Sequence, residues 1–404
     1  MRVQLGLPKS LVPVFWALLF SEATYGSYLG VWPLWIRELG APITVVGLVL
    51  GAMGVVRLIV LAPSAMIVDR LGPRRAILIG RTGTVVGLLS AAAATHWTHL
   101  APMLIGASMG AIAYPILQSL VAAQAGDQRM RAFTIIFSVG PSSALIAAPL
   151  ISGAAVALWG MRAAFVLAAI FAVVALCFLT RVKDPPAPTH HESRDASNYR
   201  TALADPATRM IALLLLATIF SLSLGTSLVP NFLEDVRGMK PAEITTIGAA
   251  AAIGSTVFGL AVARVRRFQR VPFVAVAVAI ALTAVGLMLY RFAVAVPLIV
   301  LAFFFRGGLF SAWAMLAAAA GELAPVQHRV RAFALCEMVG GLAISVGPVV
   351  AAPLYAHRAE LPFEVAIGLA LLLVPALLLA QRRAHRLSVT VHDQAAVDVP
   401  VSST

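Results

Sequence analysis

Apolar residues dominate twelve stretches of this chain, and each stretch is about as long as a helix that crosses a bilayer. Because about 20 helical residues cross the roughly 30 Å hydrocarbon layer, the pattern predicts twelve transmembrane helices, called spans 1 to 12 here. The first six lie at residues 11–36, 43–68, 76–95, 101–124, 132–157 and 163–180. The other six lie at 210–232, 244–263, 271–290, 293–320, 332–356 and 362–381. The expected fold class is an all-α membrane protein.

A polar segment at residues 181–209 interrupts this pattern with several prolines and charged side chains. Such a segment cannot pack into lipid and is typical of a linker exposed to water. It divides the spans six to six. The expected domains are an N-terminal six-helix bundle at 1–180, the linker, a C-terminal six-helix bundle at 210–381 and a disordered cytoplasmic tail at 382–404.

The two halves share a short internal repeat. Arg-Met-Arg-Ala-Phe at 129–133 recurs as Arg-Val-Arg-Ala-Phe at 329–333, which is 200 residues later. Six of the twelve positions that align between 129–140 and 329–340 are identical, and both copies lie at the entry to the fifth span of their half. Duplicated halves are typical of transporters that bind substrate where the halves meet, near the midplane. We therefore expect two pseudo-symmetric bundles.

Composition and charge agree with a chain that lies mostly in lipid. Hydrophobic residues make up 60% of the chain and charged residues 12%, with a mean hydropathy of +0.93, which excludes a water-soluble globular domain. The net charge of +13 does not indicate nucleic-acid binding, because it follows the spans. If both termini lie inside, 22 Lys and Arg residues lie on the inner side and six on the outer side. The positive-inside rule then predicts cytoplasmic termini and a cytoplasmic linker.

The sequence offers no metal or disulfide chemistry. Cys177 and Cys336 each lie inside an apolar span, where packing is their expected role. The histidine pairs at 96 and 99 and at 190 and 191 lie in polar loops and are expected to be solvated. No metal and no cofactor is expected.

The connection between spans 2 and 3 carries the most specific motif. Residues 65–75 read Ala-Met-Ile-Val-Asp-Arg-Leu-Gly-Pro-Arg-Arg. Here the chain resembles the major facilitator superfamily, whose pattern is Gly, three residues, Asp-Arg, any residue, Gly and then basic residues; Ala65 and Pro73 depart from it. The resemblance covers residues 10–381 and implies transport by alternating access.

The same resemblance implies a gate on the cytoplasmic side. Asp69 would cap the positive N-terminal end of span 11 and hold this side closed in one state. An alternative is that the basic residues only anchor the topology. The predicted gate residues are Asp69, Arg70, Gly72, Arg74 and Asp127.

A Gly-Pro turn among small residues in span 5 is the family signature of antiporters. Its counterparts are residues 144–153 in span 5 and 343–352 in span 11, where Ala or Ser replaces most glycines. The resemblance is thus to the drug/proton antiporter branch and favours efflux, although small residues also serve tight helix packing. The family's span 4 arginine is absent, since position 106 is Gly106.

Ionisable residues within spans are expensive in lipid and are the candidates for proton coupling. Glu22 lies roughly 16 Å into span 1, near the midplane, and Arg57 approaches a similar depth from span 2, so the two are expected to meet. A static ion pair is the alternative. Glu337 lies only about 9 Å into span 11 and is also a possible latch partner for Arg70 or Arg74. The proton-coupling candidates are Glu22, Arg57, Arg306 and Glu337.

Polar and aromatic stripes on four spans are the candidate walls of a substrate cavity. Helical spacing aligns several of them on one face of span 1, and shorter polar stripes occur on spans 4, 7 and 10. Packing between helices is the competing interpretation for each stripe. The candidates are Ser21, Tyr25, Tyr28, Trp32, Tyr114, Gln118, Ser223, Thr226, Asn231 and Trp313.

These patterns lead to one functional hypothesis with a named rival. We expect a proton-coupled secondary transporter that exports small amphipathic compounds from a bacterial cytoplasmic (inner) membrane and works as a monomer. The rival is proton-coupled uptake of a sugar or organic acid, which the polar stripe of span 7 favours. An enzyme is not expected, because no constellation of catalytic side chains is visible. The expected partners are a small-molecule substrate, protons and the lipid bilayer, with no nucleic acid.

Overall fold

The computed structural model describes residues 7–61, 63–126, 129–182, 206–265, 271–309, 312–313, 315–316, 319 and 329–397. Throughout these residues the regular structure is helical, and the all-α fold class is confirmed. Ten helices are long and apolar enough to cross a membrane. The chain is therefore an integral membrane protein with many spans.

The first half contains ten α-helices and two shorter turns of other helix types. In chain order they are α1 (Val12–Leu29), α2 (Trp32–Glu38), α3 (Ile43–Leu61), α4 (Ser64–Leu71), α5 (Pro73–Ala93), the 3-10 helix η1 (Trp97–Leu100), α6 (Ala101–Gly110), α7 (Ala113–Gln124), α8 (Arg129–Thr134), the π-helix η3 (Ile135–Val139), α9 (Gly140–Trp159) and α10 (Arg162–Leu179). Spans 1, 2, 4 and 5 each consist of consecutive helices in line.

The second half follows the same plan. Its described helices are α12 (Pro206–Thr226), α13 (Val229–Asp235), α14 (Pro241–Ile247), α15 (Ala249–Arg264), α17 (Pro272–Phe292), α18 (Val296–Arg306), α20 (Arg329–His357) and α21 (Leu361–Val397). Spans 1 and 7 both break before a short helix of seven residues, α2 and α13, and each of these begins with a residue followed by proline. Proline suits the first turn of a helix, where its missing N–H is not needed.

Two predicted spans are not among the ten apolar helices. The helix of span 1, α1, is not apolar enough to be among the ten. Its second half carries Ser21, Glu22, Thr24 and Ser27, which lower its mean hydropathy. For span 10, the described apolar helix is α18, and residues beyond it are only partly described. The twelve-span prediction therefore rests on ten long apolar helices, on α1, which is long enough but less apolar, and on the shorter α18.

Helix α21 is longer than the predicted span 12. It continues through the predicted end at residue 381 and ends at Val397, within the segment expected to be a disordered tail. After Pro375 this segment contains neither proline nor glycine and is rich in Ala, Leu, Arg and Gln, which favour helix. The composition therefore favours continuation of the helix beyond the predicted end of span 12.

The π-helix in span 5 has a local cause. Pro141 lies two residues after its end, and a proline ring clashes with the carbonyl of the residue four positions earlier, here Phe137. The backbone widens, and the N–H of Gly140 donates to the carbonyl of Ile135, five residues back. Span 11 has Gly341 at the equivalent position and runs as one α-helix.

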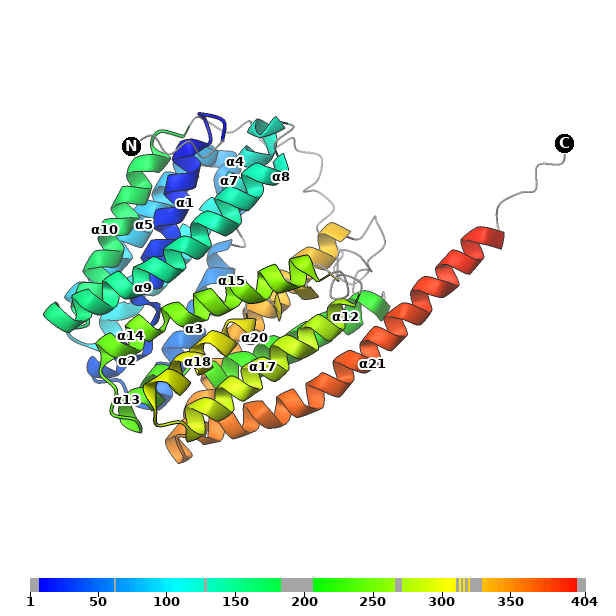
Figure 1. The fold of residues 1–404 in the computed structure, drawn as a ribbon. Helices are drawn as coiled ribbons and strands as arrows, with labels where there is room; N and C mark the ends of the chain where they lie inside the picture. Colours follow the sequence, from blue (N-terminus) through cyan, green and yellow to red (C-terminus); the bar gives the residue numbers. More distant parts are fainter. Residues whose placement is uncertain are drawn as a thin grey trace.

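The two halves form separate bundles that meet at one end. Figure 1 shows them converging around α2, α13 and α14 and diverging toward the ends where α1 and α12 begin. We call the converging end the distal side and the other the terminal side. Between the halves, α3 packs along α20, and α9 packs along α14 and α15.

Glycines allow the approach of α3 to α20. A Cβ atom at Gly47 would lie 2.5 Å from the carbonyl oxygen of Pro348, and one at Gly51 would lie 2.5 Å from that of Ser345. Both distances are too short for any side chain. Backbone contact between the halves thus depends on these two positions.

Candidate functional site

Glu22 lies in the middle of span 1, on the part of α1 that carries its polar side chains. Its side chain is half-buried and is within electrostatic reach of Arg81 on α5 and Arg57 on α3. Among the described residues it forms no ion pair within 4 Å. The expected meeting with Arg57 is therefore an interaction at longer range, and α3 packs against α20 and α6.

Arg81 is a functional candidate that the sequence analysis missed. The proton-coupling candidates did not include it, although it lies in predicted span 3; it is in the middle of α5 and only 7% exposed. Its Nη2 donates to Ser21 Oγ at 2.6 Å. Arg81 lies eight residues after Pro73, so the helical rise of about 1.5 Å per residue already puts it roughly 12 Å inside the membrane. Arg81 therefore joins Arg57 and Arg306 as a cation within a span.

Tyr25 lies within electrostatic reach of cations from both halves. It lies one turn after Ser21 on α1 and is 38% exposed. The cations are Arg57 of the first half and Arg306 of the second half. The Arg306 guanidinium also lies 5.8 Å from the centre of the Phe303 ring, a cation–π contact that holds the side chain at the end of α18.

The remaining aromatic candidates divide into packed and open positions. Tyr28 and Trp32 are buried against Phe165 of α10, so packing explains the distal half of this stripe. On α7, Tyr114 is partly exposed and lies within electrostatic reach of Glu22, and Gln118 is exposed. The open part of the candidate cavity wall therefore lies toward the terminal side.

The polar stripe of span 7 is buried in helix contacts. Ser223 Oγ donates to the carbonyl of Ile344 on α20 at 3.3 Å, and Thr226 Oγ1 donates to Leu222 within its own helix. Asn231 Nδ2 donates to the carbonyl of Pro33 at 3.5 Å. Ser223 and Asn231 therefore connect helices in this conformation, and Thr226 is bonded within α12.

The structure describes three of the predicted gate residues, Arg70, Gly72 and Arg74. Arg74 Nη2 donates to the carbonyl of Thr180 at the end of α10, and Glu337 Oε1 accepts from Trp313 Nε1 at 3.1 Å. Glu337 is thus not the partner of Arg74 here. Gly72 adopts a φ of 80°, which favours glycine, and Arg70 is exposed. The side chain of Asp69 and all of Asp127 lie outside the described residues.

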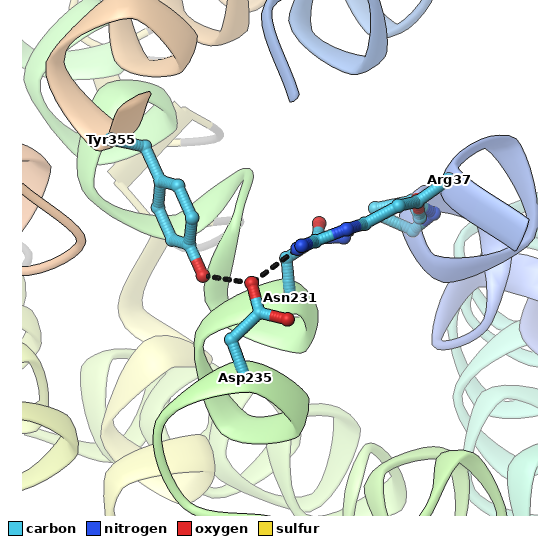
Figure 2. Close-up of polar contacts among 5 residues, drawn as sticks. Arg37, Asn231, Asp235 and Tyr355 are labelled. Carbon is cyan, nitrogen blue, oxygen red and sulfur yellow. Dashed lines mark hydrogen bonds and ion pairs between the residues drawn. The ribbon is translucent and has the colours of Figure 1, made fainter. Parts of the chain in front are cut away.

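A polar network closes the distal side. One oxygen of Asp235, at the end of α13, accepts from Arg37 of α2 and from the hydroxyl of Tyr355 on α20, the latter at 2.7 Å. Figure 2 shows the two donors approaching Asp235 from opposite directions, with Asn231 one turn away on the same helix. We call Arg37, Asp235 and Tyr355 the distal latch. The latch connects the first half to the second through spans 1, 7 and 11.

We expect Asp235→Asn to weaken closure of the distal side. The amide keeps the shape but loses the charge that Arg37 binds, and both side chains are partly exposed, at 41% for Arg37 and 27% for Asp235. The loss is then about 1–2 kcal/mol, or roughly five- to thirtyfold in the closed-to-open ratio. A cysteine at Thr245, buried beside Gly30 of the other half, should react faster with an impermeant maleimide from the distal side.

Glu364→Gln is the matched control for this prediction. Glu364 also pairs with two arginines, Arg291 and Arg358, but all three belong to the second half. It should leave the labelling rate at Thr245→Cys unchanged in a background without Cys177 and Cys336. Equal rates in the Asp235→Asn and parent proteins would show that the latch does not hold the halves together.

Comparisons with known proteins agree with this architecture. The sequence model described as Major Facilitator Superfamily matches residues 14–348. Among curated proteins, none matches the chain by sequence.

Solved structures of transporters share the fold. The nucleoside transporter NupG, solved as a point mutant, superposes with a TM-score of 0.79 at 14% identity, covering 92% of this chain and 100% of that one. A point mutant of the peptide transporter POT gives a TM-score of 0.74 at 16% identity, covering 96% and 97%. A bacterial homologue of the human lysosomal transporter Spinster, inward-facing and unoccupied, gives 0.72 at 15%, covering 96% and 98%. At these identities the likeness concerns the fold.

Proposed function

Since this chain belongs to the major facilitator superfamily, we propose that it is a proton-coupled antiporter that exports small amphipathic compounds by alternating access. The family and its transporter fold make it a membrane transporter and not an enzyme. The finer assignment, to proton coupling and to export, is our proposal.

Proton coupling is proposed on one observation, the position of Glu22. Its carboxyl group is half-buried near the midplane, within electrostatic reach of two arginines that belong to different helices, and it has no ion-pair partner among the described residues. Burial opposes ionisation of a carboxyl group and nearby cations favour it, so small movements of α3 or α5 change the balance. Such a group can bind a proton in one state and release it in the other.

Export is favoured over uptake by the antiporter-like motif of span 5 and by the contacts of span 7. The small residues of that motif lie against other helices, with Ala148 next to Gly26 of α1 and Gly153 next to Thr246 of α14, as the signature and tight packing both require. The polar stripe of span 7, which supported uptake, is engaged in contacts between helices. Uptake with protons remains the rival, and its proton would move in the same direction as the substrate.

The proposal includes an orientation and a second gate. We propose that the terminal side faces the cytoplasm of a bacterial inner membrane, as the distribution of basic residues favours. The conformation with a closed distal side would then be cytoplasm-open. Asp69, Arg70 and Arg74 would close the terminal side in the opposite state, which explains why Arg74 and Glu337 are apart here.

Proteoliposomes distinguish export from uptake by the sign of the proton flux. Vesicles are loaded with compounds from an amphipathic panel and placed in acidic medium with a fluorescent pH indicator inside. An antiporter should release the compound faster than in a medium without a pH difference, and the interior should acidify as the compound leaves. The two vesicle orientations do not affect this sign. Release accompanied by proton exit would support uptake by symport, and release without proton movement would contradict coupling.

A further inference from the structure

The site around Glu22 carries more positive than negative charge. Arg81 is held by Ser21 and lies within reach of Glu22, which leaves Arg57 and Arg306 without an ion-pair partner among the described residues. The other acid described in these inner segments, Glu337, binds the indole of Trp313 instead. Unpaired cations at membrane depth are expensive and mark a ligand or ion pathway.

Arg57 faces the interior of the protein and not the lipid. On α3, Gly51 and Gly54 lie against α20, and Val55 and Ile59 are 46% and 64% exposed. Helical spacing at about 100° per residue places Arg57 on the face opposite Val55 and Ile59. The Arg57 side chain is exposed on that inner face, where it acts on both Glu22 and Tyr25.

Arg306 comes from the other half. It ends α18, is partly exposed, and packs its guanidinium on the Phe303 ring at 5.8 Å. It lies within electrostatic reach of Tyr290 in its own half and of Tyr25 in the first half, so cations from both halves come within reach of Tyr25. When the halves approach each other on the terminal side, these like charges repel more strongly unless an anion lies between them.

We propose that the substrate is an organic anion whose acidic group binds between Arg57 and Arg306. Tyr25 and Tyr114, both partly exposed, offer ring faces for an aromatic or other planar part of the same molecule. Arginine suits this task because its planar guanidinium donates two parallel hydrogen bonds to a carboxylate. The proposal deepens the proposed function and rests on it, since it names the class of compound that is carried.

A matched series of ligands tests the sign of the charge. The series consists of 1-naphthoate, 1-naphthamide and 1-naphthylmethylammonium, together with the corresponding benzoate and indole-3-acetate sets. Binding to the purified full-length protein in detergent is measured by titration calorimetry. At least one carboxylate should bind at millimolar or lower concentration and about tenfold more tightly than its amide. Tighter binding of the ammonium compounds, or no binding by any carboxylate, would overturn the proposal.

Variants assign the binding to the two arginines. Arg57→Gln and Arg306→Gln should each weaken carboxylate binding by about tenfold or more and leave amide binding unchanged. Arg306→Lys keeps the charge and should retain most of the preference for the carboxylate. Arg264→Gln is the control, because it removes an equal charge from the exposed end of α15. Unchanged binding in both Gln variants would contradict the assignment.

The outcomes separate this proposal from the proposed function. Calorimetry in detergent reports charge selectivity without any proton gradient. Carboxylate binding without coupled proton movement in proteoliposomes would refute the antiporter and leave the anion site standing. Coupled transport restricted to neutral or cationic members of the series would refute the anion site and leave the antiporter standing.

Discussion

Glu22→Gln is expected to leave substrate binding intact and to abolish transport driven by a pH difference. The amide imitates the protonated carboxyl group and cannot release a proton, so the two directions of the cycle lose their dependence on proton binding. Vesicles with the variant should exchange labelled for unlabelled substrate at equal pH on both sides. They should build no substrate gradient from an imposed pH difference. Accumulation in these vesicles should fall to the level of vesicles without the protein.

Glu337→Gln serves as the comparison for this variant. Its carboxyl group is exposed and accepts from Trp313, so removing its charge should slow transport less and preserve coupling. A Glu22→Gln protein that still accumulates substrate at the normal rate would make Glu22 a structural charge. Glu337 would then be the next candidate for the proton site.

Gly51→Leu is expected to stop transport by preventing closure of the distal side. Any side chain at this position would collide with the backbone carbonyl of Ser345 and with Val349, and the collision ends only when α3 and α20 separate. Overpacking at a close contact costs about 1–3 kcal/mol, so the closed state should become up to roughly a hundredfold less populated. The cysteine at Thr245 should then be labelled from the distal side almost completely.

Folding should survive this substitution, because the contact joins the two halves and not the helices within one bundle. Gly259→Leu is the control, since a Cβ atom added at Gly259 would have no neighbouring atom within 4 Å and this position is exposed on α15. Both variants should elute as the parent does in size-exclusion chromatography. Normal transport by Gly51→Leu would mean that α3 and α20 do not need to meet during the cycle.

The pattern of apolar stretches predicted most of the helices. In lipid every backbone N–H and C=O must be hydrogen-bonded within the protein, and a long apolar segment achieves this as a helix. The internal repeat did not predict the π-helix, because the offset of 200 between the two copies holds from Arg129 through Gly140, beyond the end of the π-helix at Val139. The sequence difference that accompanies the π-helix is Pro141, which corresponds to Gly341 in span 11.

The site was harder to predict because the depth of a residue in the membrane and the direction of its side chain are separate properties. Counting residues gave the depth of Glu22, and the same count applied to Arg81 would have found the second buried charge. Direction was not available from the spacing alone. Tyr28 on span 1 and Asn231 on span 7 each belong to a predicted stripe, yet both are buried against neighbouring helices. Packing between helices decides which part of a stripe is covered.

The distal latch also bears on how a duplicated protein comes to close. Pro33 of α2 and Pro230 of α13 occupy equivalent places in the two halves, and at this offset Arg37 corresponds to Glu234, the neighbour of Asp235. At the same offset Asp235 corresponds to Glu38, so each half carries an acid at this place. In a two-fold contact a residue of one half meets a non-equivalent residue of the other, and two identical halves could form such an ion pair twice. In this chain the second half carries Glu234 where the first carries Arg37, so Asp235 receives one arginine, and Tyr355 supplies its second donor.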